Sequence, residues 1–155
     1  MKICNSKMIE GVLLTPLCEI DASPGFVLKF ITDQSEGFAG FAECYISEIA
    51  PNNVKAWKYH EERTQNICVP FGQVRLVVYD SNKCSSTFGV LNEFVLGRSK
   101  NFMRLTIPPR LWYGFVCISS THGLIVNLIN VRHGANDMKS KNSAPDIPYI
   151  WQETE

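Results

Sequence analysis

Short hydrophobic runs that recur at close intervals are the feature of this sequence that most limits how it folds. The runs are rich in Val, Ile, Phe, Tyr and Leu, and clusters of Gly, Pro, Asn and Ser separate them. This pattern is typical of β-strands joined by turns, and no amphipathic helix pattern competes with it. We therefore predict an all-β protein with strands over residues 11–17, 25–30, 40–49, 54–60, 65–69, 73–79, 87–96, 101–107, 113–119 and 123–130.

The alternation within single runs predicts how the strands pack. Between residues 73 and 79, Val74, Leu76 and Val78 share one face of the strand, while Arg75 and Tyr79 share the other. About ten short strands without helices predict a sandwich or jelly roll, whose inner faces form either a packed core or a ligand cavity. With 155 residues, 45% of them hydrophobic, the chain fits one domain over residues 1–155. Residues 134–148 are polar, and we expect them to form a surface excursion before 149–151 packs back.

Charge and cysteine usage limit the partners and the compartment. Lys plus Arg and Asp plus Glu both number 15, so the chain has no positive field that would favour nucleic acid or a membrane surface. The six cysteines are scattered rather than paired at close spacing, which indicates free thiols. No membrane-spanning run or signal peptide is evident. We expect a cytoplasmic protein that binds neither nucleic acid nor a membrane.

The segment that ends at His60 contains the side chains best suited to catalysis. In an extended strand, His60, Lys58 and Ala56 share one face, and Tyr59, Trp57 and Lys55 share the other. If the first face lines the barrel interior, it offers a proton acceptor beside a positive charge. Such a pair suits removal of a proton next to a ketone, since the cation would stabilise the enolate oxygen. The alternative is a structural histidine at a strand end, and this reading is stronger still for His122 and His133.

A second segment places aromatic side chains near a strand start. Pro108 and Pro109 predict a sharp turn, after which Trp112 and Tyr113 begin the next strand. These aromatics either cover the end of the barrel or stack against a base or sugar, with a phenol available as a proton donor.

Several motifs together resemble the dTDP-4-dehydrorhamnose 3,5-epimerase family. Their order and spacing cover about residues 21–151, and they are Asp21-Ala22-Ser23-Pro24-Gly25-Phe26, the stretch ending at His60, Gly72-Gln73-Val74, Asp80 with Ser86-Thr87-Phe88-Gly89, Ile107-Pro108-Pro109 and Tyr113-Gly114-Phe115. The resemblance implies a cupin-type jelly-roll β-barrel, usually a homodimer, that binds a sugar nucleotide inside the barrel without a metal or organic cofactor. His60 matches the family's base, and we expect the N-terminal segment 11–17 to help build the dimer interface.

The sequence also departs from the family pattern. Pro24 and Trp57 stand where the family has arginines, and Gln65 replaces the lysine that supports the enolate. Val126 stands where the family has the tyrosine that acts as the general acid. The chain ends at Glu155, before the segment that supplies the aspartate partner of the histidine.

These departures define the candidate site. We expect Tyr113 to act as the acid across the cavity from His60, and Lys58 to act as the cation beside the enolate. No second histidine lies near His60, so we expect no metal site, and the resemblance implies that no organic cofactor is needed. The candidate substrate-binding residues are Lys55, Trp57, Gln65, Asn66, Arg75, Arg104, Trp112 and Asn127.

Three functions remain open from the sequence. The first is an epimerase that acts at C3, C5 or both on a nucleoside-diphosphate 4-keto or 4-keto-6-deoxy sugar, in cell-surface glycan biosynthesis. The second is an inactive subunit that binds a sugar nucleotide or supports assembly, since fold does not guarantee function. The third is a keto-isomerase of a 4-keto sugar nucleotide.

Overall fold

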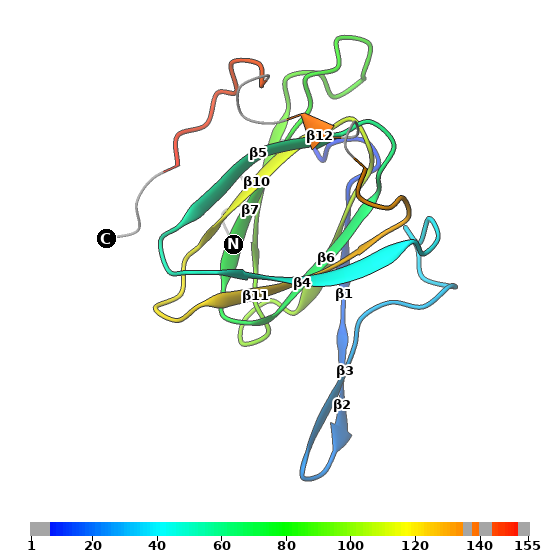
Figure 1. Cartoon of the computed structure of the whole chain (residues 1–155), viewed down its shortest axis with the longest axis vertical. Helices are drawn as coiled ribbons and strands as arrows, with labels where there is room; N and C mark the ends of the chain where they lie inside the picture. Colours follow the sequence, from blue (N-terminus) through cyan, green and yellow to red (C-terminus); the bar gives the residue numbers. More distant parts are fainter. Residues whose placement is uncertain (1–6, 135–137, 140–143, 152–155) are drawn as a thin grey trace.

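Two antiparallel five-stranded sheets face each other and close into a barrel (Figure 1). The computed structural model describes residues 7–134, 138–139 and 144–151, so Cys4 and parts of the polar excursion lie outside the described residues. The first sheet has the order β1 (Leu13–Pro16), β9 (Met103–Ile107), β6 (Gln65–Phe71), β11 (Gly123–Ile129) and β4 (Glu43–Ile49). The second has the order β12 (Met138–Lys139), β5 (Val54–His60), β10 (Trp112–Cys117), β7 (Val74–Tyr79) and β8 (Leu91–Leu96). The described residues contain no helix, which confirms the all-β prediction.

The core lies between the two sheets, where alternate residues of each strand point inward. Val74, Leu76 and Val78 of β7 all belong to the buried cluster, while Arg75 lies outside it. This confirms the alternation predicted for that strand. The inner faces meet as in a jelly roll, so side chains fill much of the barrel.

The strands missed by the sequence prediction are polar or short. β2 (Cys18–Ala22) and β3 (Gly25–Lys29) pair as a hairpin, although only β3 was predicted, because the Glu and Asp of β2 lower its hydrophobic signal. β12 lies in the polar excursion, where two residues give no periodicity. Residues 87–90, predicted as the start of a strand, form a turn before β8.

A bulge in β5 changes which side chains share a face. Lys58 lies opposite Tyr113 of β10, but Lys55 lies opposite Phe115, so three steps on β5 match two steps on β10. Since paired residues share a face, Lys55 faces the same side as Lys58. Gly114 lies between the inward residues Tyr113 and Phe115, so a side chain at this position would point outward. A Cβ built on Gly114 would lie 2.5 Å from the Cβ of Ala56, so Ala56 is also on the outer face. The predicted faces of Lys55 and Ala56 are therefore wrong, because simple alternation does not anticipate a bulge.

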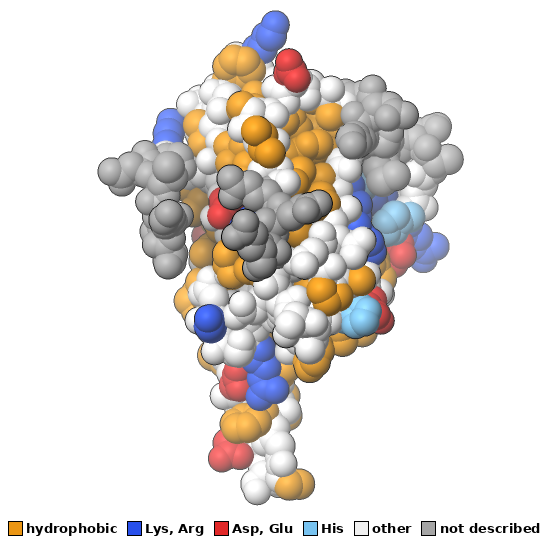
Figure 2. All heavy atoms as spheres, turned by 90° about the vertical axis from the view of Figure 1, so that its left-hand side faces the viewer, with side chains coloured by type: hydrophobic (Ala, Val, Ile, Leu, Met, Phe, Trp, Pro, Cys, Tyr) orange, Lys and Arg blue, Asp and Glu red, His pale blue; other side chains and the backbone are white. Residues whose placement is uncertain are grey.

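The β2–β3 hairpin projects away from the barrel (Figure 1). Hydrophobic side chains are visible on this projection in Figure 2, and Ile20, Phe26 and Val27 are 47%, 58% and 52% exposed. Arg98 ties the hairpin to the barrel, because it pairs with Glu19 at 3.0 Å and lies over the Phe26 ring at 5.3 Å. By contrast, the predicted interface segment 11–17 is largely occupied within its own chain, since β1 pairs with β9.

Candidate active site

Five polar side chains gather at one end of the barrel interior, and we call them the interior polar cluster. Its members come from both sheets and are His60, Tyr113, Gln65, Asn127 and Tyr45. They lie at the same end because β5 finishes there, β6 and β10 begin there, and β11 approaches its last residue there. The opposite end of the interior is apolar and belongs to the core.

His60 and Tyr113 form the centre of this cluster. Nε2 of His60 lies 3.3 Å from the hydroxyl of Tyr113, and the two side chains are 4% and 3% exposed. They come from neighbouring strands, β5 and β10. Tyr113 therefore lies beside His60, and not across the interior from it as the sequence interpretation expected.

The facing sheet contributes a second group of linked side chains. The Asn127 amide donates to the Tyr45 hydroxyl at 2.8 Å and also to Oε1 of Gln65. Gln65 Nε2 and Asn127 Oδ1 are buried and have no hydrogen-bond partner among the described residues. A buried donor and a buried acceptor without partners are costly, so both are available to hydrogen-bond a substrate.

Lys58 brings a positive charge to the inner face of β5. Its Nζ lies 5.0 Å from the centroid of the Phe115 ring, which belongs to the core. Burial, and to a smaller extent the charge of Lys55, lower the pKa of Lys58 below its ordinary value. Lys55 itself is exposed and donates to the backbone oxygen of Glu48 at 2.9 Å, so it lies at the rim.

Three predicted substrate-binding residues lie on the outer face of the second sheet. The Trp57 ring packs against Trp151 at 5.2 Å between centroids, which confirms that the C-terminal segment packs back on the barrel. Trp112 packs against Tyr59. Arg75 pairs with Glu93 at 3.6 Å, a contact made by the face of β7 opposite the core.

Two further predicted binding residues stabilise a loop that covers the first sheet. Arg104 donates to the backbone oxygens of Glu36 at 2.6 Å and Phe30 at 3.4 Å. Asn66 donates to the backbone oxygen of Gly37 at 3.1 Å. Both point away from the interior, because Leu105 and Ile67, their sequence neighbours, occupy the core. Their contacts are structural, and the structure does not bring them to the interior polar cluster.

Sequence reasoning missed two residues of this region, Arg63 beside His60 and Tyr45 on the facing sheet. Arg63 is 1% exposed, and its Nη1 lies 3.1 Å from Nδ1 of His60. Burial raises the pKa of Tyr45 above its ordinary value, and the Asn127 hydrogen bond and the charge of Arg63 offset only part of this rise. Arg63 lies in the turn after β5, where strand alternation gives no direction. The alternation of β4 would have placed Tyr45 and Ile49 on the same inner face.

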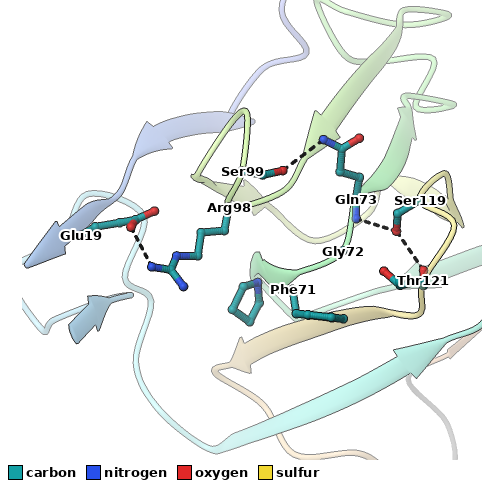
Figure 3. Close-up of a pocket in the computed structure, with 9 residues that line it drawn as sticks. Glu19, Phe71, Gly72, Gln73, Arg98, Ser99, Ser119 and Thr121 are labelled. Carbon is teal, nitrogen blue, oxygen red and sulfur yellow. Dashed lines mark hydrogen bonds and ion pairs between the residues drawn. The ribbon is translucent and has the colours of Figure 1, made fainter. Parts of the chain in front are cut away.

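A separate hollow lies between the hairpin and the far end of the barrel (Figure 3). It has a volume of about 640 Å³, and its lining includes Arg98 and Glu19 together with Phe71 and Gln73. β6 runs from Gln65 in the interior polar cluster to Phe71 in this hollow, so the two sites are at opposite ends of that strand.

Two features are absent from residues 7–134, 138–139 and 144–151, the part of the chain that the structure describes. Over those ranges, no three His, Cys, Asp or Glu side chains come close enough together to hold a metal ion. In the same ranges, no helix has the length and apolar character needed to cross a membrane.

Two facing antiparallel sheets that enclose a buried His–Tyr pair define a cupin-type jelly-roll barrel. No protein-family model matches the chain. A dTDP sugar isomerase from Desulfovibrio desulfuricans G20 is 38% identical, with a TM-score of 0.89 over 95% of this chain and 94% of that chain. The chain belongs to the dTDP-4-dehydrorhamnose 3,5-epimerase-like family, which confirms the resemblance seen in the sequence.

Two further proteins are similar to this chain, one in fold and one in sequence. The dTDP-4-dehydrorhamnose 3,5-epimerase from Elizabethkingia anophelis NUHP1 shares the fold, with a TM-score of 0.79, 15% identity, and coverage of 96% of this chain and 85% of that chain. The spore coat polysaccharide biosynthesis protein SpsL of Bacillus subtilis (strain 168) is 25% identical over 147 residues, which is 93% of this chain and 97% of that protein.

Proposed function

We propose that this protein epimerises a nucleoside-diphosphate 4-keto or 4-keto-6-deoxy sugar at C3, C5 or both, in the biosynthesis of a cell-surface glycan. The observation that carries the proposal is the buried contact of 3.3 Å between His60 and Tyr113 inside a barrel of this family. A dTDP sugar isomerase and a polysaccharide biosynthesis protein among its relatives support this substrate class.

The chemistry follows from the acidity of a carbon next to a ketone. Removing its proton leaves an enolate, whose oxygen carries the negative charge and needs donors or a cation. The His60–Tyr113 pair takes this proton from the carbon next to the ketone. Gln65 Nε2 donates to the developing oxyanion, and the charge of Lys58 adds a longer-range stabilisation. No metal or organic cofactor enters this scheme.

Inversion requires that the proton return to the opposite face of the carbon. Tyr113 lies beside His60 and so serves the same face, which removes it from the role that the sequence interpretation gave it. Tyr45 belongs to the facing sheet, and its raised pKa keeps the phenol protonated at neutral pH. We therefore assign the return of the proton to Tyr45.

The protein is proposed to act as a homodimer in the cytoplasm. A two-stranded hairpin is marginally stable in water on its own, and the β2–β3 hairpin exposes Ile20, Phe26 and Val27. A second copy of the chain would cover these side chains. The cysteines Cys18, Cys44, Cys68, Cys84 and Cys117 are free thiols, which supports a reducing compartment.

Solvent deuterium incorporation tests the proposed reaction. Position-by-position NMR of a panel of 4-keto sugar nucleotides in D₂O should show exchange beside the keto group followed by inversion. His60→Asn should abolish exchange, whereas His122→Asn is the matched control, because His122 is an exposed residue paired with Glu48. Binding without exchange would instead support the inactive subunit, and movement of the keto group would support the keto-isomerase.

A further inference from the structure

Two neighbouring amides of the interior polar cluster each use only half of their hydrogen-bonding capacity. Nε2 of Gln65 and Oδ1 of Asn127 have no hydrogen-bond partner among the described residues, and the two residues are 1% and 4% exposed. The other half of each amide is occupied, because Asn127 Nδ2 donates to Oε1 of Gln65 and to the Tyr45 hydroxyl. The cluster therefore offers a ligand one donor and one acceptor from adjacent side chains.

The strand order places Asn127 between Gln65 and Tyr45. Asn127 lies on β11, and this strand runs between β6, which carries Gln65, and β4, which carries Tyr45. Tyr45 lies directly opposite Asn127 on one side, and Ile67 of the hydrophobic core lies opposite it on the other. The two unpartnered atoms thus lie where the core meets the polar end of the interior.

A donor beside an acceptor matches a ketone that has a hydroxyl on the adjacent carbon. The ketone oxygen can accept from Gln65 Nε2, while the hydroxyl can donate to Asn127 Oδ1. In a 4-keto sugar nucleotide, the hydroxyl-bearing carbon next to the ketone is C3, because C5 carries the ring oxygen and C6. A ligand that lacks this hydroxyl would leave a buried acceptor unpaired, which is a strong basis for discrimination.

We propose that Gln65 and Asn127 together bind the 4-keto and 3-hydroxyl groups of the sugar, and that Asn127 is the specificity-determining residue that directs proton removal to C3. The inference rests on the proposed function and narrows its reacting carbon to C3. With the ketone at Gln65 and the hydroxyl at Asn127, C3 lies on the side of Tyr45, the residue assigned to return the proton.

Removal of the C3 proton strengthens these contacts. The proton passes to the His60–Tyr113 pair, the C–H electron pair forms the double bond between C3 and C4, and the π electrons of the ketone move onto O4. O3 and O4 then lie in one plane, with the negative charge on the oxygen that Gln65 binds. Proton removal at C5 would leave O3 on a tetrahedral carbon. The donor and acceptor therefore favour the transition state for reaction at C3 over the bound substrate.

The acceptor at O3 also affects which carbonyl forms again. An amide oxygen accepts a hydrogen bond without removing the proton, so O3 keeps its hydrogen when Asn127 binds it. The carbonyl then returns at C4 once C3 is protonated. This contact favours epimerisation over movement of the keto group to C3.

Deuterium incorporation by the wild-type protein tests the assignment without a variant. The substrate is dTDP-linked 4-keto-6-deoxyglucose in D₂O, and each rate is divided by the rate without protein. We expect exchange at C3 to exceed exchange at C5 by about 5–150-fold, the penalty for leaving a buried acceptor unpaired. Equal exchange at the two carbons, or faster exchange at C5, would overturn the inference and leave the epimerase proposal intact.

A second experiment compares this substrate with its 3-deoxy analogue. Asn127→Leu should reduce the wild-type preference for the 3-hydroxyl sugar, in kcat/KM for exchange at C3, by about 5–150-fold. The intrinsic difference in acidity between the two sugars cancels, because both are measured with each protein. Asn66→Leu is the matched control and should keep the preference, since Asn66 is as deeply buried but contacts Gly37 and Thr106 on the other face. An unchanged preference in Asn127→Leu would overturn the inference.

Binding measurements separate failure of the inference from failure of the proposed function. If the wild-type protein exchanges no substrate, the epimerase proposal fails. Calorimetric titration with the same two sugar nucleotides then decides whether the preference for the 3-hydroxyl depends on Asn127. dTDP alone should bind the wild type and Asn127→Leu with the same affinity. A loss of dTDP affinity as large as the loss for the sugar nucleotide would show that Asn127 binds the base, and would overturn the inference.

Discussion

Arg63 donates from Nη1 to Nδ1 of His60 across 3.1 Å, and the same guanidinium holds the backbone that follows β11. One side chain thus links the end of β5 in the second sheet to the end of β11 in the first. This connection joins the His60–Tyr113 pair to the sheet that carries Tyr45. Its contribution to the free energy of unfolding can be measured in the absence of substrate.

Arg63→Met should destabilise the fold. The variant removes the donors to the oxygens of Val131 and Arg132 as well as the contact with His60, and loss of partners to partly buried polar groups costs about 1–3 kcal/mol. Urea denaturation measures the free energy of unfolding. The exposed Arg132 offers a matched control, and Arg132→Met should change stability by less than about 0.5 kcal/mol. Equal stability of the two variants would mean that Arg63 does not link the sheets.

Tyr45→Phe should slow inversion more than exchange. The phenol is assigned to the return of the proton, so the substrate should gain deuterium about 10²–10⁴-fold faster than product forms, the range for loss of a general acid. Parallel NMR measurements of exchange and product formation give this ratio. Tyr149→Phe is the control, because that hydroxyl donates to Glu93 on the outer face. An unchanged ratio in Tyr45→Phe would assign the returned proton to water.

Lys58→Met should stabilise the protein while lowering its activity. Burial lowers the pKa of Lys58 from 10.5, so the folded state holds this proton less tightly than the unfolded state. Below the lowered pKa, the buried charge reduces the free energy of unfolding, and this penalty disappears as pH rises to 10.5. Lys58→Met should remove the penalty and raise the free energy of unfolding by up to about 1 kcal/mol. The free energy of unfolding of this variant should also change less between pH 7 and 10 than that of the wild type. Thermal unfolding across this range measures both effects, and a loss of stability would contradict the prediction.

Phe26→Asp should convert a dimer into monomers. Phe26 is 58% exposed on the hairpin, and a carboxylate there would be buried at the proposed interface at high cost. Sedimentation velocity at micromolar concentration should report a dimer for the wild-type chain. Phe88→Asp is the control, since Phe88 is 51% exposed but lies in the turn before β8. A wild-type monomer, or a dimer that persists in Phe26→Asp, would contradict the proposed interface.

Sequence periodicity predicted most of the barrel but only part of the site. Alternation placed His60 and Lys58 on the inner face of β5, and the structure confirms both. It failed for Lys55 and Ala56, because the bulge opposite β10 inserts a residue into the pairing. It also gave no position for Arg63, because the direction of a side chain in a turn depends on contacts with the distant backbone at Val131.

The outward residues Arg75 and Arg104 show a different limit of sequence reasoning. Both were predicted to bind substrate, but Arg75 pairs with Glu93 and Arg104 donates to the backbone oxygens of Glu36 and Phe30. A sequence does not distinguish an arginine that binds a ligand from one that holds a loop, because both roles use the same donors.

The separation of the interior into a polar end and an apolar end has a consequence for how this protein can change. Ile49, Val69 and Leu96 lie at the apolar end of their strands and are almost fully buried, so they add hydrophobic stabilisation at a distance from the polar end. Tyr113 is the member of the interior polar cluster that also belongs to the buried core. Substitutions of Tyr45, Gln65 and Asn127 alter the polar end of the interior without removing a side chain of that core. A combinatorial library limited to Tyr45, Gln65 and Asn127 is therefore a practical route to new substrate ranges, because each variant keeps the His60–Tyr113 pair and the hydrophobic core of the barrel.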